Sequence, residues 1–229
     1  MKKHWKAGAL ALAMTLALTA CGGESGEITK FDAAAYVDGL LQENYLGQFE
    51  QSYLELVGID EEIAQDTHEH CMEQEVGYFT YYFDVSEPTD EIREEFQTLL
   101  EEIYSHTRYE VISAAEQEDG SFSVKVEVEP IDIIQLVRSD WDKSTEDFYE
   151  EYPVERINAM SDAEYEKMDQ EWAQLILELV REKMPEIGNQ TSQSIVVQVE
   201  KNEDGYYSIV SDDFSKLHDL ILDYSGTEA

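Results

Sequence analysis

The sequence predicts an α+β fold: N-terminal helices followed by an antiparallel sheet built from two hairpins, with a long helix between the hairpins and a C-terminal helix. Apolar residues recur at helical spacing over residues 92–104. Apolar and polar residues alternate strictly over residues 121–129, as in a half-buried strand. Ser161 and Glu164 have the spacing of a capping box, which opens another helix. Helical and extended patterns therefore occupy separate runs, which is typical of the α+β class.

Two helices are expected before residue 88. The first carries an apolar face over residues 31–54, continues past Gly47 and ends at Gly58. The second begins at Asp60, a good N-cap residue, and is broken by Pro88. Its apolar side chains share one helical face: Met72, Val76, Phe79 and Phe83.

The first hairpin follows a third helix, which is capped by Thr89 or Asp90. Residues 109–115 and 121–129 supply the two strands. The turn between them is Glu118-Asp119-Gly120, and Asp-Gly suits a tight turn because such a turn needs positive φ.

The second half of the chain repeats this order of helix and hairpin. Residues 131–152 are expected to be helical, although their pattern is less regular. The helix opened by the capping box ends by Gly188. A second hairpin pairs residues 195–199 with 206–210, and a last helix starts near Ser211.

The first twenty residues differ from everything that follows. Three lysines precede an apolar run over residues 7–20, which is shorter than the roughly 20 residues of a membrane-spanning helix. The next residues, Leu18-Thr19-Ala20-Cys21, resemble the lipobox of bacterial lipoproteins. The resemblance implies that the signal peptide is cut between Ala20 and Cys21 and that the Cys21 sulfur carries a diacylglycerol.

This reading divides the chain into three parts. Residues 1–20 are the lipoprotein signal peptide, residues 21–30 are the lipidated cysteine with a flexible tether, and residues 31–229 are a single acidic α+β domain. We expect the protein on the extracytoplasmic face of the cell membrane of a Gram-positive cell. Its membrane partner is the lipid on Cys21, since several buried acyl chains give stable anchoring.

The charge of the mature chain excludes one class of partner. Cleavage before Cys21 would leave 12 basic and 52 acidic residues, a net charge of −40. Such a surface repels the phosphates of nucleic acid, so we expect an unknown protein or small-molecule ligand instead. The chain is still 42% hydrophobic, which is enough to build a core.

Metal-capable side chains are densest at Asp66, His68, His70 and Cys71. On a helix, His68 and His70 point about 200° apart, so at most two of the four share a face. The two acidic turns before Gly120 and Gly205 lack the ligand spacing of a calcium loop. We therefore expect no metal and no cofactor. With Cys21 used by the lipid, Cys71 is either free or paired between two chains.

No catalytic residue is assigned, because no phosphate loop, nucleophile elbow or Cys–His pair is recognisable. Fourteen tyrosines, among them Tyr78, Tyr81 and Tyr82, could anchor an interface, but we expect most of them in the core or at its boundary.

Two segments carry a resemblance to a known group of proteins. The first is the strand ending Val126-Glu127-Val128-Glu129-Pro130, and the second is the hairpin over residues 197–209 with its Asp-Gly turn followed by aromatic residues. Together they resemble uncharacterised lipoproteins of gut Firmicutes. Many of those are thought to have an α+β cone similar to nuclear transport factor and ketosteroid isomerase. The resemblance implies a fold and no activity.

Two functions from different classes follow. The first is a non-catalytic binding or interaction module at the cell surface. The alternative is an enzyme with a cone-type pocket in which a buried carboxylate and a tyrosine transfer a proton. A deep pocket around an acid of raised pKa would favour the enzyme.

Overall fold

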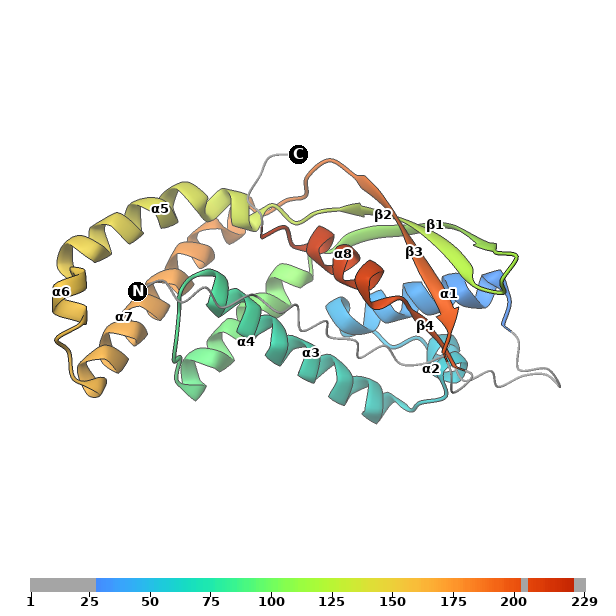
Figure 1. The fold of residues 1–229 in the computed structure, drawn as a ribbon, viewed down its shortest axis with the longest axis horizontal. Helices are drawn as coiled ribbons and strands as arrows, with labels where there is room; N and C mark the ends of the chain where they lie inside the picture. The colour runs from blue at the N-terminus through green and yellow to red at the C-terminus, as the bar shows by residue number, and fades with distance from the viewer. Residues whose placement is uncertain (1–27, 203–205, 225–229) are drawn as a thin grey trace.

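The computed structural model describes residues 28–202 and 206–224. The predicted signal peptide, Cys21, the tether up to residue 27 and residues 203–205 of the second predicted turn lie outside these ranges. The fold is α+β, as predicted (Figure 1). Its elements, in chain order, are α1 (Lys30–Leu41), η1 (Gln42–Leu46), α2 (Gln51–Val57), α3 (Glu61–Tyr82), α4 (Asp90–Tyr104), β1 (Arg108–Glu116), β2 (Phe122–Glu129), α5 (Ile133–Glu151), α6 (Val154–Ile157), α7 (Asp162–Lys183), η2 (Met184–Glu186), β3 (Gln193–Lys201), β4 (Tyr207–Ile209) and α8 (Ser211–Ile221).

The sheet is antiparallel with the strand order β1-β2-β3-β4. The alternation predicted for β2 is confirmed, because Val124 and Val126 are fully buried while Lys125 between them is partly exposed. The predicted Asp-Gly turn is also present. Gly120 has φ +82°, and the side chain of Asp119 accepts hydrogen bonds from the backbone and hydroxyl of Ser121.

Helices cover the apolar face of the sheet. α1 packs on β1 and β2, and α8 packs on β3 and β2. α3 and α4 pack against each other (Figure 1). The π-helical turn η1 contacts both helices. The buried apolar side chains of helices and strands join in one contiguous core.

The first predicted helix is not continuous, and that expectation is wrong. α1 passes into η1, and Gly47 then adopts a left-handed conformation with φ +57°. The chain folds back, so that α2 lies across α1. A Cβ atom added to Gly39 would lie 2.1 Å from Cδ2 of Tyr53, so this close approach requires glycine. The apolar spacing continues through the break because both short helices bury their apolar faces in the same core.

The helix starts follow the predicted caps. Asp60 accepts a hydrogen bond from the backbone N–H of Ile63, Thr89 accepts one from Ile92, and Ser161 forms its capping box with Glu164. α1 also has a capping box at Thr29, and Ile28 before it is buried. The ordered structure therefore includes the last residues assigned to the tether.

α5, α6 and α7 form a helical arm between β2 and β3. α5 and α7 pack against each other, α6 joins them at the tip, and the arm extends away from the sheet (Figure 1). The two ends of the arm meet at the sheet, where the backbone N–H of Gln190 donates to the carbonyl of Pro130. The helix predicted for residues 131–152 is thus α5, one side of this arm.

Candidate functional site

A cluster of acid, tyrosine and histidine side chains lies inside the core. The Tyr104 hydroxyl donates to Oε2 of Glu75 at 2.7 Å, and Nδ1 of His218 lies 3.4 Å from Oε1 of the same carboxyl group. The Tyr45 hydroxyl lies 2.9 Å from Nδ1 of His218. Burial raises the pKa of Glu75, and the nearby His218 and the hydrogen bond from Tyr104 oppose that rise. This is the pairing of a buried acid with tyrosine that the enzyme hypothesis requires.

A second buried acid lies close by on η1. Glu43 is fully buried and accepts a short hydrogen bond from the Tyr53 hydroxyl, while its Oε1 has no hydrogen-bond partner among the described residues. Burial raises the pKa of Glu43 to about 7, and the Tyr53 hydrogen bond acts in the opposite direction. The Cys71 thiol lies beside this region, 3.6 Å from Oδ1 of Asn44, and is buried and free of any disulfide.

Both acids are closed off from solvent. Glu75 is 6% exposed, and a surface cleft that reaches this region contains Tyr45 and His68 but neither Glu75 nor Glu43. The acids can therefore influence the stability of the domain and its dependence on pH. A substrate that enters this cleft would not contact the carboxyl group of Glu75 or Glu43.

The predicted group of metal-capable residues is dispersed on α3. His68 contacts the carbonyl of Asn44 through Nδ1, His70 lies beside Glu73 on the exposed face, and Cys71 points into the core. Within residues 28–202 and 206–224, no three His, Cys, Asp or Glu side chains converge on a position that could hold a metal ion.

The three tyrosines noted in the sequence have different surroundings. Tyr82 packs on Phe83 and Trp141 at the base of the arm. Tyr78 is 36% exposed beside His218, and Tyr81 is 70% exposed. The expected packing role therefore fits Tyr82 best.

α7 packs on α4 and also holds the loop between α3 and α4. The Asp169 carboxylate accepts hydrogen bonds from the backbone N–H groups of Ser86 and Glu87, and the indole N–H of Trp172 donates to the carbonyl of Phe83 at 2.6 Å. Between these contacts, Asp84 adopts φ +58°, and it is the sole non-glycine residue of the described ranges with positive φ. α7 thus fixes the loop that presents Asp84.

Asp84 lines a cavity of about 160 Å³ between α5 and α7. Four aromatic side chains contribute to its wall: Phe148, Tyr149, Tyr165 and Trp172. The Phe148 and Trp172 rings pack with their centroids 4.8 Å apart. Partial burial raises the pKa of the Asp84 carboxyl group.

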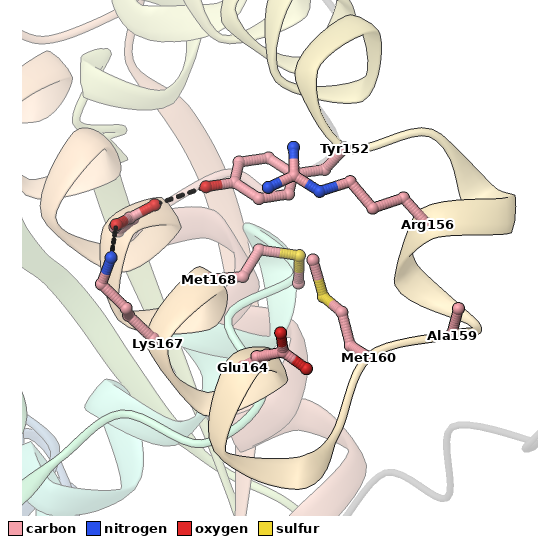
Figure 2. Close-up of a pocket in the computed structure, with 8 residues that line it drawn as sticks. Tyr152, Arg156, Ala159, Met160, Glu164, Lys167 and Met168 are labelled. Carbon is pink, nitrogen blue, oxygen red and sulfur yellow. Dashed lines mark hydrogen bonds and ion pairs between the residues drawn. The ribbon is translucent and has the colours of Figure 1, made fainter.

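A second, more open cleft of about 370 Å³ adjoins this cavity and shares Met168 with it. Figure 2 shows the guanidinium group of Arg156 over the Tyr152 ring, 4.3 Å from its centroid. Glu171 accepts a hydrogen bond from the Tyr152 hydroxyl and pairs with Lys167. Each of these polar groups already has a partner, and their contacts link α6 to α7 through Tyr152.

The geometry defines an α+β domain with a helical arm that carries a small aromatic cavity. No family model matches the chain, and no curated protein matches it. A similar solved structure is that of "a putative lipoprotein (ycdA)" from Bacillus subtilis subsp. subtilis strain 168, with a TM-score of 0.53 and 13% identity. The match covers 83% of this chain and 56% of that chain, so this chain spans little more than half of its neighbour's length.

At this identity, the likeness shows a shared fold alone. The cone expected from the family resemblance is not identified by this comparison and stays a prediction. None of the helices within the described ranges is long and apolar enough to cross a membrane.

Several of these residues escaped the sequence analysis although a signal was present. Glu75 lies on the same helical face as Met72 and Phe79, and Asp169 lies on the same face as Trp172. An acid at an apolar position of an amphipathic helix is the pattern that marks them. Asp84 gave no such signal, because its positive φ depends on contacts with α7.

Proposed function

We propose that this chain is a lipid-anchored, extracytoplasmic binding module without catalytic activity, and that the helical arm α5–α7 is its binding part. The assignment of binding to the arm rests on the contrast between the two candidate sites. The acids of the core are enclosed by their partners, whereas the aromatic cavity of the arm opens to solvent. A binding site needs access and complementary groups, and the arm has both.

Anchoring is supported by the lipobox-like residues 18–21 and by the charged n-region before them. The structural neighbour is itself described as "a putative lipoprotein", which agrees with this proposal. The proposed attachment is the acylated Cys21, the cysteine of the lipobox-like residues. In this proposal, the lipid holds the domain on the outer face of a Gram-positive cell membrane.

Cys21→Ala tests the anchor. Labelled palmitate should enter the unmodified protein and be absent from the variant, which should leave the membrane fraction. Protease added to intact cells should digest the anchored domain. Cys71→Ala is the matched control, because it removes the other cysteine and should leave labelling unchanged. Equal labelling of the Cys21→Ala variant would refute the anchor.

The enzyme hypothesis has one specific observation in its favour: the buried Glu75 with its raised pKa and its hydrogen bond from Tyr104. Proton transfer would require that pair to meet a substrate. A screen of small ligands by thermal shift separates the two functions. Ligands whose effect is lost in Glu75→Gln and kept in Asp84→Asn would favour the enzyme, and the reverse result would favour the arm as a binding site.

A further inference from the structure

We propose that the cavity between α5 and α7 binds an alkylammonium group, with Asp84 as its counter-charge and the surrounding aromatic rings as its wall. This inference rests on the proposed function of the arm and names the chemical class of its ligand. Such a group could belong to a free small molecule or to a lysine side chain.

The wall of the cavity favours a cation over other ligands. Four aromatic rings line it, and aromatic faces attract ammonium groups through their quadrupole. Its other lining side chains are apolar, hydroxyl or acidic, and no lysine or arginine is among its described lining residues. An anion would therefore meet two carboxylates, Asp84 and Asp169, without any basic side chain to pair with it.

Asp84 is the group that the chain leaves unpartnered. Asp169, the other acid, is engaged by the backbone of Ser86 and Glu87. The Asp84 backbone donates to the carbonyl of Tyr81, but its carboxyl group has no hydrogen bond and no ion pair within the described ranges. Asp84 is exposed at the surface, and partial desolvation still raises the pKa of this carboxyl group. Its backbone is held at positive φ, a conformation that is unfavourable for a non-glycine residue and often occurs at functional sites.

The loop geometry is fixed before any ligand arrives. Trp172 and Asp169 hold the backbone on both sides of Asp84, so the position of Asp84 beside the cavity does not depend on a flexible loop. A preorganised charge binds with a smaller entropic cost. The negative charge of the whole chain, −37, also raises the local concentration of cations.

The size of the cavity limits the part of a ligand that it can enclose. A volume of 160 Å³ corresponds to about five water molecules at roughly 30 Å³ each. A methylated or primary ammonium group with a short alkyl chain fits this space, whereas a nucleotide or an oligosaccharide is too large to be enclosed.

Binding is measured by two-dimensional NMR on the domain that starts after Cys21, where Trp141 and Trp172 are the two remaining tryptophans. Tetramethylammonium and n-butylammonium chlorides are titrated at constant ionic strength, and 3,3-dimethyl-1-butanol serves as the uncharged analogue. We expect saturable shifts of the Trp172 indole signal with both cations, and at least about tenfold weaker binding of the alcohol.

The matched variants are Asp84→Asn and Glu87→Gln. Both remove one negative charge within the same loop, and asparagine tolerates positive φ. Because Glu87 is exposed and does not line the cavity, its variant reports the effect of net charge alone. Asp84→Asn should weaken cation binding about tenfold and Glu87→Gln less than about twofold. Tyr149→Leu should weaken binding, and Tyr149→Phe should preserve it, since Tyr149 lines the cavity and is 50% exposed.

Each further outcome decides a separate question. Equal binding of the cations and the alcohol would refute recognition of a positive charge, while the arm would remain a binding site. Equal loss in Asp84→Asn and Glu87→Gln would overturn Asp84 as the counter-charge. Absence of any saturable shift would overturn this inference, while the palmitate experiment tests the anchor independently. Nα-acetyl-lysine amide binding tighter than n-butylammonium would identify a peptide-borne lysine as the source, and weaker binding would identify a free cation.

Discussion

Asp169 binds the backbone N–H of Ser86 through both of its carboxylate oxygens, at 3.0 and 3.1 Å, although the two residues are 83 positions apart in the chain. One of these oxygens also accepts the N–H of Glu87 at 2.7 Å. Asp169 is 2% exposed, so these backbone donors replace water as the partners of its buried carboxylate.

We expect Asp169→Ala to destabilise the domain by about 2–4 kcal/mol, because two backbone donors lose a charged acceptor in a part-buried setting and the loop loses its link to α7. Urea unfolding followed by circular dichroism measures the change. Glu166→Ala removes an exposed acid from the same helix and should change stability by less than about 0.5 kcal/mol. Similar effects of the two substitutions would contradict the role assigned to Asp169.

A pair of glycines tests the close packing of α1 on α2. Gly39→Ala would place a Cβ atom 2.1–2.8 Å from three atoms of Tyr53, so α2 must shift, at a cost of about 2 kcal/mol or more. Gly77→Ala lies in α3 with no atom within 4 Å of the new Cβ. It should stabilise the domain by about 0.5–1 kcal/mol through helix propensity. Thermal unfolding of both variants should thus give shifts of opposite sign.

Glu43 gives the domain a specific dependence on pH. Its pKa in the folded protein, about 7, lies above the ordinary value of 4.5, so the folded state binds more protons than the unfolded state between these values. The stability associated with Glu43 is fully present below pH 4.5 and is lost as the pH rises through about 7.

Glu43→Gln should therefore gain stability relative to the unmodified protein between pH 5 and 8, by up to about 3 kcal/mol. Glutamine retains an acceptor for the Tyr53 hydroxyl. Glu102→Gln, on the exposed face of α4, controls for the loss of one negative charge. Parallel curves of stability against pH for Glu43→Gln and Glu102→Gln would show that the buried acid has no special influence.

Salt should stabilise the domain as a whole. A net charge of −40 after cleavage repels itself most strongly in the compact state. Salt screens that repulsion over about 10 Å at 0.1 M. The melting temperature of the lipid-free domain should rise from very low salt to 0.3 M NaCl. Calcium at matched ionic strength should add no saturable transition, and a rise at micromolar calcium would reveal a specific site.

Local patterns in the sequence predicted those elements whose geometry depends on neighbouring residues. The alternation in β2, the caps at Asp60, Thr89 and Ser161 and the Asp-Gly turn are all of this kind. The break at Gly47 was missed because the apolar spacing continues across it. Its left-handed backbone is compatible with a helical pattern on both sides.

The sites were harder to predict, since they depend on contacts between distant segments. In a chain with 52 acidic residues, composition cannot distinguish Glu75 or Asp84 from the acids of the surface. Burial of Glu75 follows from packing between α3, α4 and α8. The backbone of Asp84 depends on Trp172, which is 88 positions further along the chain and bonds to the preceding residue.

The arm leaves and rejoins the sheet at two strands that are direct neighbours. β2 and β3 pair antiparallel, and Gln190 bonds to Pro130 where the arm begins and ends. The tip of this connection, α6, buries none of its residues, so the tip can change in length or sequence without altering which residues pair across the sheet. A hairpin joint of this kind lets the strands keep their register while the tip of the arm varies.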